Sequence, residues 1–153
     1  MKLFVMRHAQ ASFGAVSDRE RPITQYGTEQ TKRLLLEHQD SFLHVNKLWS
    51  SDLLRAQQTA QIVSGQINVT AETHTFLSPD GDVKSVLDRL RQLPHDTCLF
   101  IVSHQPLVGE LVSCLLYGNI HQAHPYATSE VLALELDWFE PGMASLVKQF
   151  LPS

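Results

Sequence analysis

The stretch Cys98-Leu99-Phe100-Ile101-Val102-Ser103-His104-Gln105-Pro106 decides the fold, because an uninterrupted apolar run is followed at once by polar residues. A continuous run such as 98–102 is typical of a central strand that is covered on both faces. Pro106 fits the first turn of a helix, which we expect to run to Tyr117 and to end at Gly118. The stretch therefore predicts a strand, a short loop and a helix, with His104 just after the strand.

The same alternation of strand and helix extends along most of the chain. Strands are predicted where apolar and β-branched residues cluster, over 2–6, 45–50, 69–73, 131–136 and 145–151. Helices are predicted over 25–38 with Thr24 as N-cap, after the capping residues Ser51 and Asp52, and from Asp82 to 93. Turns are expected at 78–82 and 140–142. This order predicts an α/β sandwich with a mostly parallel central sheet, and residues 1–153 are expected to form a single domain.

Composition argues against several classes of protein. The 153 residues are 43% apolar and 18% charged, which is ordinary for a soluble globular protein, and the net charge of -4 argues against a general nucleic-acid binder. The apolar runs at 3–6 and 98–102 are far shorter than the roughly 20 residues of a membrane span, and no secretory apolar region is expected. Cys98 and Cys114 are expected to be buried thiols of a reducing compartment, so we expect a cytoplasmic protein.

Two arginines and two histidines from three separate segments are expected at one edge of the sheet. Arg7 and His8 follow the first strand, His104 follows the strand over 98–102, and Arg55 lies in the first turn of the helix after 45–50. In such sheets the working site lies at the carboxyl ends of the strands. Two arginines in one cleft repel each other unless an anion lies between them, and guanidinium groups bind phosphoryl oxygens in a bidentate way.

This set of residues predicts a phosphoryl-transfer site. One histidine can attack phosphorus through a ring nitrogen, and the other can stabilise the charge on a transferring oxygen. We expect no metal and no cofactor, because the side chains already supply positive charge. His121 and His124 lie in a proline-containing loop without an obvious third ligand, so they are expected to be surface histidines rather than a metal pair.

Four ordered motifs carry a resemblance to a known family: MRHA at 6–9, RPITQYG at 21–27, SSDLLRAQQTA at 50–60 and VSHQP at 102–106. They resemble the histidine phosphatase superfamily, also called phosphoglycerate mutase-like. The short chain, with LSPDGD at 77–82 and SHQPLVG at 103–109, looks most like the SixA-type phosphohistidine phosphatases. The resemblance implies a three-layer α/β/α sandwich without a cap or lid subdomain. It also implies that His8 is the nucleophile, that Arg7 and Arg55 bind phosphate, and that His104 is the second histidine of the pocket.

Two residues depart from the family pattern. Ala9 stands where a glycine is usual, and Gln10 stands where many relatives carry a glutamate. The motifs assign no carboxylic acid that would protonate the leaving group. Position alone offers candidates for such an acid: Glu72, Asp80 and Asp82, for which turn formation and helix capping are the favoured roles, and Asp18 in the loop after His8.

Three functions remain open. The first is removal of phosphate from phosphohistidine on a signalling protein, such as a phosphotransfer domain, through a covalent phosphohistidine. The segment 69–82 is too short for a lid domain, so we expect an open site. An imidazole leaving group can already carry a proton, because histidine titrates near pH ~6.5, whereas an alkoxide would need an acid. The second is a small-molecule phosphoester phosphatase of the same superfamily. The third is a non-catalytic phosphoprotein-binding module, which would not need His8.

Overall fold

The buried strand predicted over 98–102 is β4 (Cys98–Ser103), and it lies inside a six-stranded sheet. The computed structural model describes residues 1–153. β4 pairs in parallel with β1 (Lys2–Arg7) and β2 (Lys47–Ser50), and β2 pairs in parallel with β3 (Ala71–Thr73). β5 (Val131–Glu135) and β6 (Ser145–Phe150) extend the sheet beyond β1 as antiparallel strands. The order β3-β2-β4-β1-β5-β6 confirms the predicted, mostly parallel sheet.

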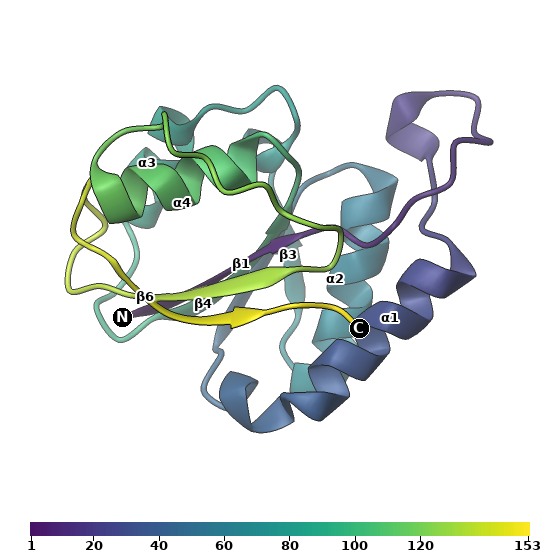
Figure 1. Cartoon of the computed structure of the whole chain (residues 1–153), viewed down its shortest axis with the longest axis horizontal. Helices are drawn as coiled ribbons and strands as arrows, with labels where there is room; N and C mark the ends of the chain where they lie inside the picture. The colour runs from purple at the N-terminus through teal and green to yellow at the C-terminus, as the bar shows by residue number, and fades with distance from the viewer.

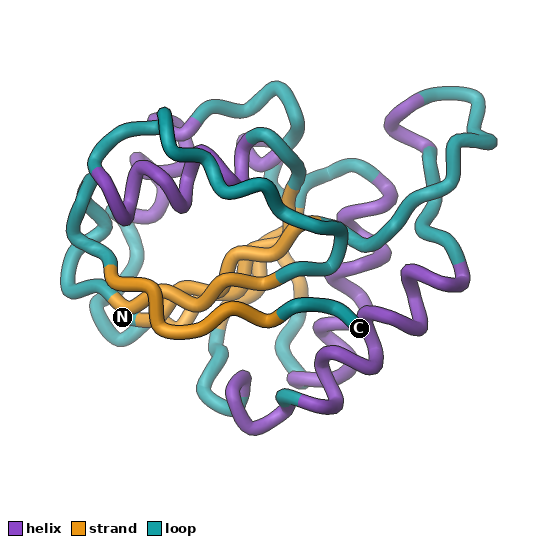
Figure 2. The backbone as a smooth tube through the Cα atoms, viewed as in Figure 1, coloured by secondary structure: helices purple, strands orange, loops and turns teal.

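Four helices cover the two faces of this sheet (Figures 1 and 2). They are α1 (Gln25–Glu37) and α2 (Leu54–Ile67) on one face, and α3 (Val83–Leu90) and α4 (Leu107–Tyr117) on the other. β1 shows why both faces are apolar, because successive side chains of a strand point to opposite faces. Leu3 and Val5 lie in the core beneath α3 and α4, whereas Phe4 and Met6 pack with α1 and α2. The predicted three-layer α/β/α sandwich is thereby confirmed.

The helix ends largely follow their predicted caps. Thr24 accepts the N–H of Gly27 at 2.9 Å, and Asp82 accepts the N–H of Ser85 at 2.7 Å. Gly118 ends α4 with a φ of 84°, a conformation that glycine adopts without steric cost. None of the helices has the length and hydropathy that crossing a membrane requires.

Two helix boundaries differ from prediction for physical reasons. α2 begins at Leu54 with Leu53 as its N-cap, so the expected capping role of Ser51 and Asp52 is wrong. The Ser51 side chain instead bonds to a histidine of the site described below. α3 ends at Leu90 rather than at 93, because the N–H groups of Gln92 and Leu93 bond to carbonyls only three residues back, and Pro94 disfavours helical conformation at Leu93.

Candidate active site

The structure brings together the two arginines and two histidines singled out in the sequence. Arg7 ends β1 and is followed by His8, His104 follows β4, and Arg55 lies in the first turn of α2. β1 and β4 are parallel and in register at these ends, so the two histidine rings lie side by side with their centroids 5.0 Å apart. Arg55 Nε lies 3.4 Å from His8 Nε2. Three chain segments thus meet at the carboxyl edge of the sheet.

The two ring nitrogens of His8 have different roles: Nδ1 is a donor and Nε2 is an acceptor. Its Nδ1–H donates to the carbonyl of Ala9 at 2.7 Å, so Nε2 carries the lone pair on the side of Arg55. Burial, reinforced by the nearby guanidinium groups of Arg55 and Arg7, outweighs the bond to Ala9 and lowers the pKa of His8 to about 4. His8 is therefore neutral at neutral pH, with Nε2 available for attack on phosphorus.

Ala9, which stands where the family usually has glycine, fits without exposure to solvent. Its N–H donates to Thr59 Oγ1 at 3.0 Å, and the same hydroxyl donates to the carbonyl of Arg55 at 2.7 Å. These bonds tie the residue after His8 to the helix that carries Arg55. Sequence reasoning did not single out Thr59, although its place one helical turn after Arg55 puts both on one face.

Ser51 orients His104. The Ser51 hydroxyl oxygen accepts the N–H of Leu53 at 3.2 Å and lies 2.7 Å from His104 Nε2. His104 Nε2 is the one acceptor within hydrogen-bond distance of the Ser51 hydroxyl, so we assign the hydroxyl as the donor to that ring nitrogen. This assigns the ring proton of His104 to Nδ1, which is buried and has no partner in the protein. Burial, with His8 and Arg55 nearby, lowers the pKa of His104 to about 3. His104 is thus a neutral donor with an unused N–H.

Arg7 supplies a second unused donor. Its Nη1 donates to the carbonyl of Tyr126 at 2.8 Å, whereas its Nε is buried and has no partner. Burial, together with the charge of Arg55, lowers the pKa of Arg7. An anion bound between the two guanidinium groups would offset their repulsion and accept hydrogen bonds from the donors that the protein leaves unpaired.

Asp18 contacts the site through Arg55. The Arg55 side chain is almost fully buried; its Nη1 donates to the Asp18 carbonyl at 2.7 Å and its Nη2 to the Asp18 carboxylate at 3.2 Å. Arg21 donates to the other carboxylate oxygen at 3.1 Å. These hydrogen bonds, that from Arg21 foremost, lower the pKa of Asp18. Asp18 is therefore held as a carboxylate, which argues against a role as a proton donor to a leaving group.

The other carboxylates considered as acids have structural roles elsewhere. Glu72 on β3 pairs with Lys47 at 3.2 Å, Asp82 caps α3, and Asp80 lies in the exposed turn before it. No hydrogen bond or ion pair joins any of them to the site residues. Their favoured roles in capping and turn formation describe Asp82 and Asp80 well.

The segment before β5 supports Arg7 and was missed by sequence reasoning. The buried Glu130 accepts the N–H of Ala127 at 2.9 Å and the amide of Gln149 at 2.8 Å, and it pairs with His124. The backbone N–H of Arg7 donates to the Glu130 carbonyl at 3.1 Å. His124 is thus half-buried and paired with a carboxylate, rather than a free surface histidine. The one available signal was a charged residue directly before a buried apolar strand.

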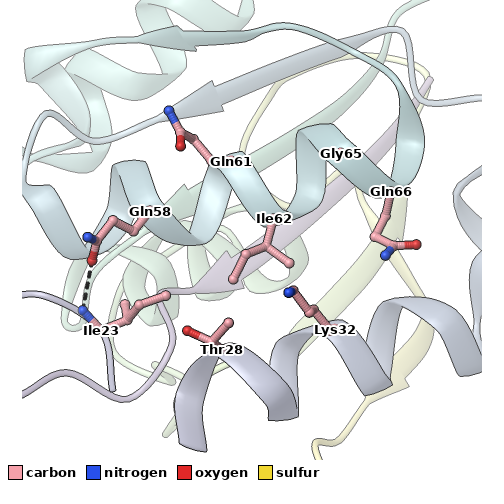
Figure 3. A pocket seen from close by; sticks show the side chains of 8 residues that line it. All are labelled: Ile23, Thr28, Lys32, Gln58, Gln61, Ile62, Gly65 and Gln66. Atoms are coloured by element: carbon pink, nitrogen blue, oxygen red, sulfur yellow. Dashed lines mark hydrogen bonds between the residues drawn. The ribbon is translucent and has the colours of Figure 1, made fainter. Parts of the chain in front are cut away.

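The largest cavity of the molecule lies away from these residues. It has a volume of about 520 Å³ and lies between α1 and α2, where Gln58 accepts the N–H of Ile23 at 2.8 Å (Figure 3). None of the five cavities is lined by the two arginines and two histidines. No group of three or more His, Cys, Asp or Glu side chains is placed to hold a metal ion. The candidate site is therefore identified by its buried polar atoms without partners, Arg7 Nε and His104 Nδ1, and not by a cavity.

Comparison with known proteins places this geometry in a family. The model of the histidine phosphatase superfamily (branch 1) matches residues 3–78. The phosphohistidine phosphatase SixA of Escherichia coli (strain K12) is 32% identical over 141 residues, which cover 90% of this chain and 86% of that protein. A SixA homolog of Haemophilus influenzae is 33% identical over 130 residues, covering 78% of this chain and 79% of the homolog.

Solved structures agree with the sequence matches. The protein histidine phosphatase SixA complexed with tungstate superposes with a TM-score of 0.89 at 31% identity, covering 99% of this chain and 97% of that one. A SixA from Agrobacterium tumefaciens shares the fold with a TM-score of 0.82 at 18% identity, covering 99% of this chain and 97% of that one. This chain therefore belongs to the histidine phosphatase superfamily and is a phosphatase similar to SixA.

Proposed function

We propose that this phosphatase removes the phosphoryl group from phosphohistidine on a signalling protein, such as a phosphotransfer domain. His8 is the nucleophile, Arg7, Arg55 and His104 bind the phosphoryl oxygens, and no metal takes part. Matched proteins support the substrate class, because one is named a phosphohistidine phosphatase and one a protein histidine phosphatase. Tungstate, which one of them binds, is a tetrahedral oxyanion like phosphate.

The observation that carries the proposal is a pair of buried donors without partners in a site where His8 has an unprotonated Nε2. Arg7 Nε and His104 Nδ1 have no hydrogen-bond partner in the protein, and the ring of His8, whose Nε2 is unprotonated, lies 5.0 Å from the ring of His104, measured between centroids. Buried donors without partners are rare in native proteins. A phosphoryl group would accept both bonds while its phosphorus faces His8.

The reaction follows from this arrangement in two steps. The Nε2 lone pair of His8 forms a bond to phosphorus, while the P–N bond of the substrate breaks and its electron pair returns to the departing imidazole. Water then attacks the phosphorus of phospho-His8, and the P–Nε2 bond breaks to release phosphate and neutral His8. The two arginines and His104 stabilise the charge on the oxygens in both transition states.

None of the four candidate carboxylates is placed to donate a proton, which favours a substrate whose leaving group needs no proton from the enzyme. Asp18 is held ionised, and Glu72, Asp80 and Asp82 make no contact with the site. An imidazole leaves as a neutral molecule when its distal nitrogen already carries a proton, whereas a serine or sugar alkoxide requires a donor. The segment between β3 and α3, residues 74–82, forms only two turns and is too short for a lid domain, which supports a substrate side chain carried by another protein.

The test is loss of phosphate from a phosphorylated histidine-phosphotransfer domain. The wild type should release phosphate, also in excess EDTA, with a kcat/KM well above that for phosphoserine peptides or sugar phosphates. His8→Ala should abolish turnover while its Tm stays close to that of the wild type, because the loss concerns chemistry. Mass spectrometry of wild-type protein quenched during turnover should show a phosphoryl adduct on His8. Faster turnover of a small phosphoester, or activity of His8→Ala near the wild-type rate, would contradict the proposal.

A further inference from the structure

Asp18 lies at the edge of the site on a loop that is held at several points. The loop between β1 and α1 carries a short 3-10 turn that begins at Asp18 (Figure 1). Arg19 in this turn pairs with Asp52, just before α2, and Arg21 donates to the Asp18 carboxylate. Arg55 bonds to both the carbonyl and the carboxylate of Asp18. The carboxylate is therefore fixed in position although 61% of the side chain is exposed to solvent.

The Arg55 guanidinium lies between the nucleophile and this carboxylate. Its Nε is directed to His8 Nε2, and its Nη2 is bonded to Asp18 Oδ2. In phosphoryl transfer the attacking and leaving atoms lie roughly in line with phosphorus between them. A phosphoryl group held on this guanidinium and attacked by His8 has its leaving group on the side away from His8, and Asp18 is the carboxylate bonded to the same guanidinium.

The charge of Asp18 also acts on His104. It partly offsets the lowering of the pKa of His104 that burial and the neighbouring cations cause. A fixed negative charge at this position disfavours an alkoxide that develops negative charge as it leaves. The same charge attracts a leaving group that carries a proton and a positive charge.

We propose that Asp18 determines leaving-group specificity, because its carboxylate accepts a hydrogen bond from the N–H of a departing protonated imidazole and disfavours phosphoesters. The inference rests on the proposed function, since it presumes that phosphohistidine is the substrate. It assigns to Asp18 a role opposite to that of a general acid: the residue holds a proton on the leaving group and never donates one.

The chemistry balances without a further reactant. The substrate imidazole is bonded to phosphorus through one nitrogen and carries a proton on the other. As the bond from His8 Nε2 to phosphorus forms, the substrate P–N bond breaks, and its electron pair neutralises the imidazolium. The imidazole leaves neutral and keeps its distal proton. Asp18 favours this route because a nearby carboxylate stabilises the protonated form of the bound substrate.

The experiment compares two small substrates of similar size, N-phosphoimidazole and phenyl phosphate, in wild type and Asp18→Asn. We expect Asp18→Asn to lower the ratio of their kcat/KM values about tenfold or more, because one charge-assisted hydrogen bond is lost for phosphoimidazole only. The matched control is Glu20→Gln, which removes a charge from the same turn where no side-chain hydrogen bond or ion pair is made. This control should leave the ratio unchanged. Asp18→Glu should restore part of it.

A second measurement separates this role from mere support of Arg55. The kcat of the wild type on phosphoimidazole should fall at high pH as the bound imidazolium loses its proton, and Asp18→Asn should shift that limb to lower pH. An equal loss on both substrates, an unchanged ratio or an unmoved limb would overturn the inference. Wild-type protein that hydrolyses phenyl phosphate but neither phosphoimidazole nor a phosphohistidine domain would reject the proposed function instead.

Discussion

Arg55 links most parts of the site through one planar group. Its three nitrogens are directed to different atoms: Nε toward His8, Nη1 to the Asp18 carbonyl and Nη2 to the Asp18 carboxylate. A lysine ammonium is a compact charge on a flexible stem and cannot reproduce three donors in a fixed plane. The identity of the residue at this position therefore matters as much as its charge.

We expect Arg55→Lys to lower kcat/KM about 10²-fold or more, similar to the loss of one oxyanion donor in other enzymes. The measurement is steady-state hydrolysis of a phosphohistidine domain, with Tm recorded to check folding. Arg33→Lys is the matched control, because Arg33 is exposed on α1 and bonds only to the carbonyl of Ser153. Near-normal turnover by Arg55→Lys would show that positive charge alone suffices here.

At the scale of the elements, α1 supports the segment that follows His8. The first turn of α1 contacts this segment so closely that a Cβ at Gly27 would lie 2.7 Å from the carbonyl oxygen and 3.0 Å from the nitrogen of Gln10. Both are backbone atoms, which cannot move without shifting the chain that leads back to His8. α2 approaches the same segment from the other side through Thr59, which bonds to Ala9.

Two glycine substitutions on neighbouring helices should have opposite effects. Gly27→Ala should lower the free energy of unfolding by about 1–3 kcal/mol through overpacking, and should also lower activity by displacing the segment after His8. Gly65→Ala on α2 meets no atom within 4 Å, so it should raise stability by roughly 0.5–1 kcal/mol through lower backbone entropy of the unfolded chain and leave activity unchanged. Urea unfolding and steady-state rates test both. A destabilised Gly65→Ala or an active, stable Gly27→Ala would contradict this packing.

At the scale of the whole molecule, local patterns in the sequence predict the layers and the edge where the site lies. The apolar run of β4 and the caps Thr24 and Asp82 are local signals, because each spans only a few consecutive residues. Such signals identify a strand or the start of a helix directly. Parallel strands meet at their carboxyl ends, which is why His8 and His104 could be expected side by side. The family motifs added roles to positions that topology had already grouped.

The unpredicted contacts join residues that are distant in sequence. Serine is a residue type favoured at helix N-caps, yet the Ser51 hydroxyl bonds to His104, which lies in another segment of the chain. Glu130 supports Arg7 across the sheet, and no periodic pattern connects their positions. Asp18 could be named as a candidate, but the lowering of its pKa depends on Arg21 and Arg55 in the folded chain. Pairings of this kind depend on tertiary packing, which local patterns do not encode.

Burying two neutral histidines should make the whole protein sensitive to acid. Folding lowers the pKa of His8 to about 4 and that of His104 to about 3, whereas both titrate near pH ~6.5 when unfolded. Below about pH 6.5 the two histidines therefore bind protons in the unfolded chain but not in the native protein. The free energy of unfolding falls as the pH falls, until the native histidines are protonated too. The carboxylates of Asp18 and Glu130 remain ionised over most of this range, because their pKa values are lowered.

We expect urea unfolding to show this loss between about pH 6.5 and 4.5, with His8 alone contributing on the order of 2–3 kcal/mol. His8→Asn removes the titrating ring, so the fall in stability over this range should be smaller by that amount. His121→Asn changes a histidine in an exposed turn and should keep the wild-type slope. If His8→Asn loses stability with acid as steeply as the wild type, the ring of His8 is not buried in its neutral form, and its readiness as a nucleophile at neutral pH would need another cause.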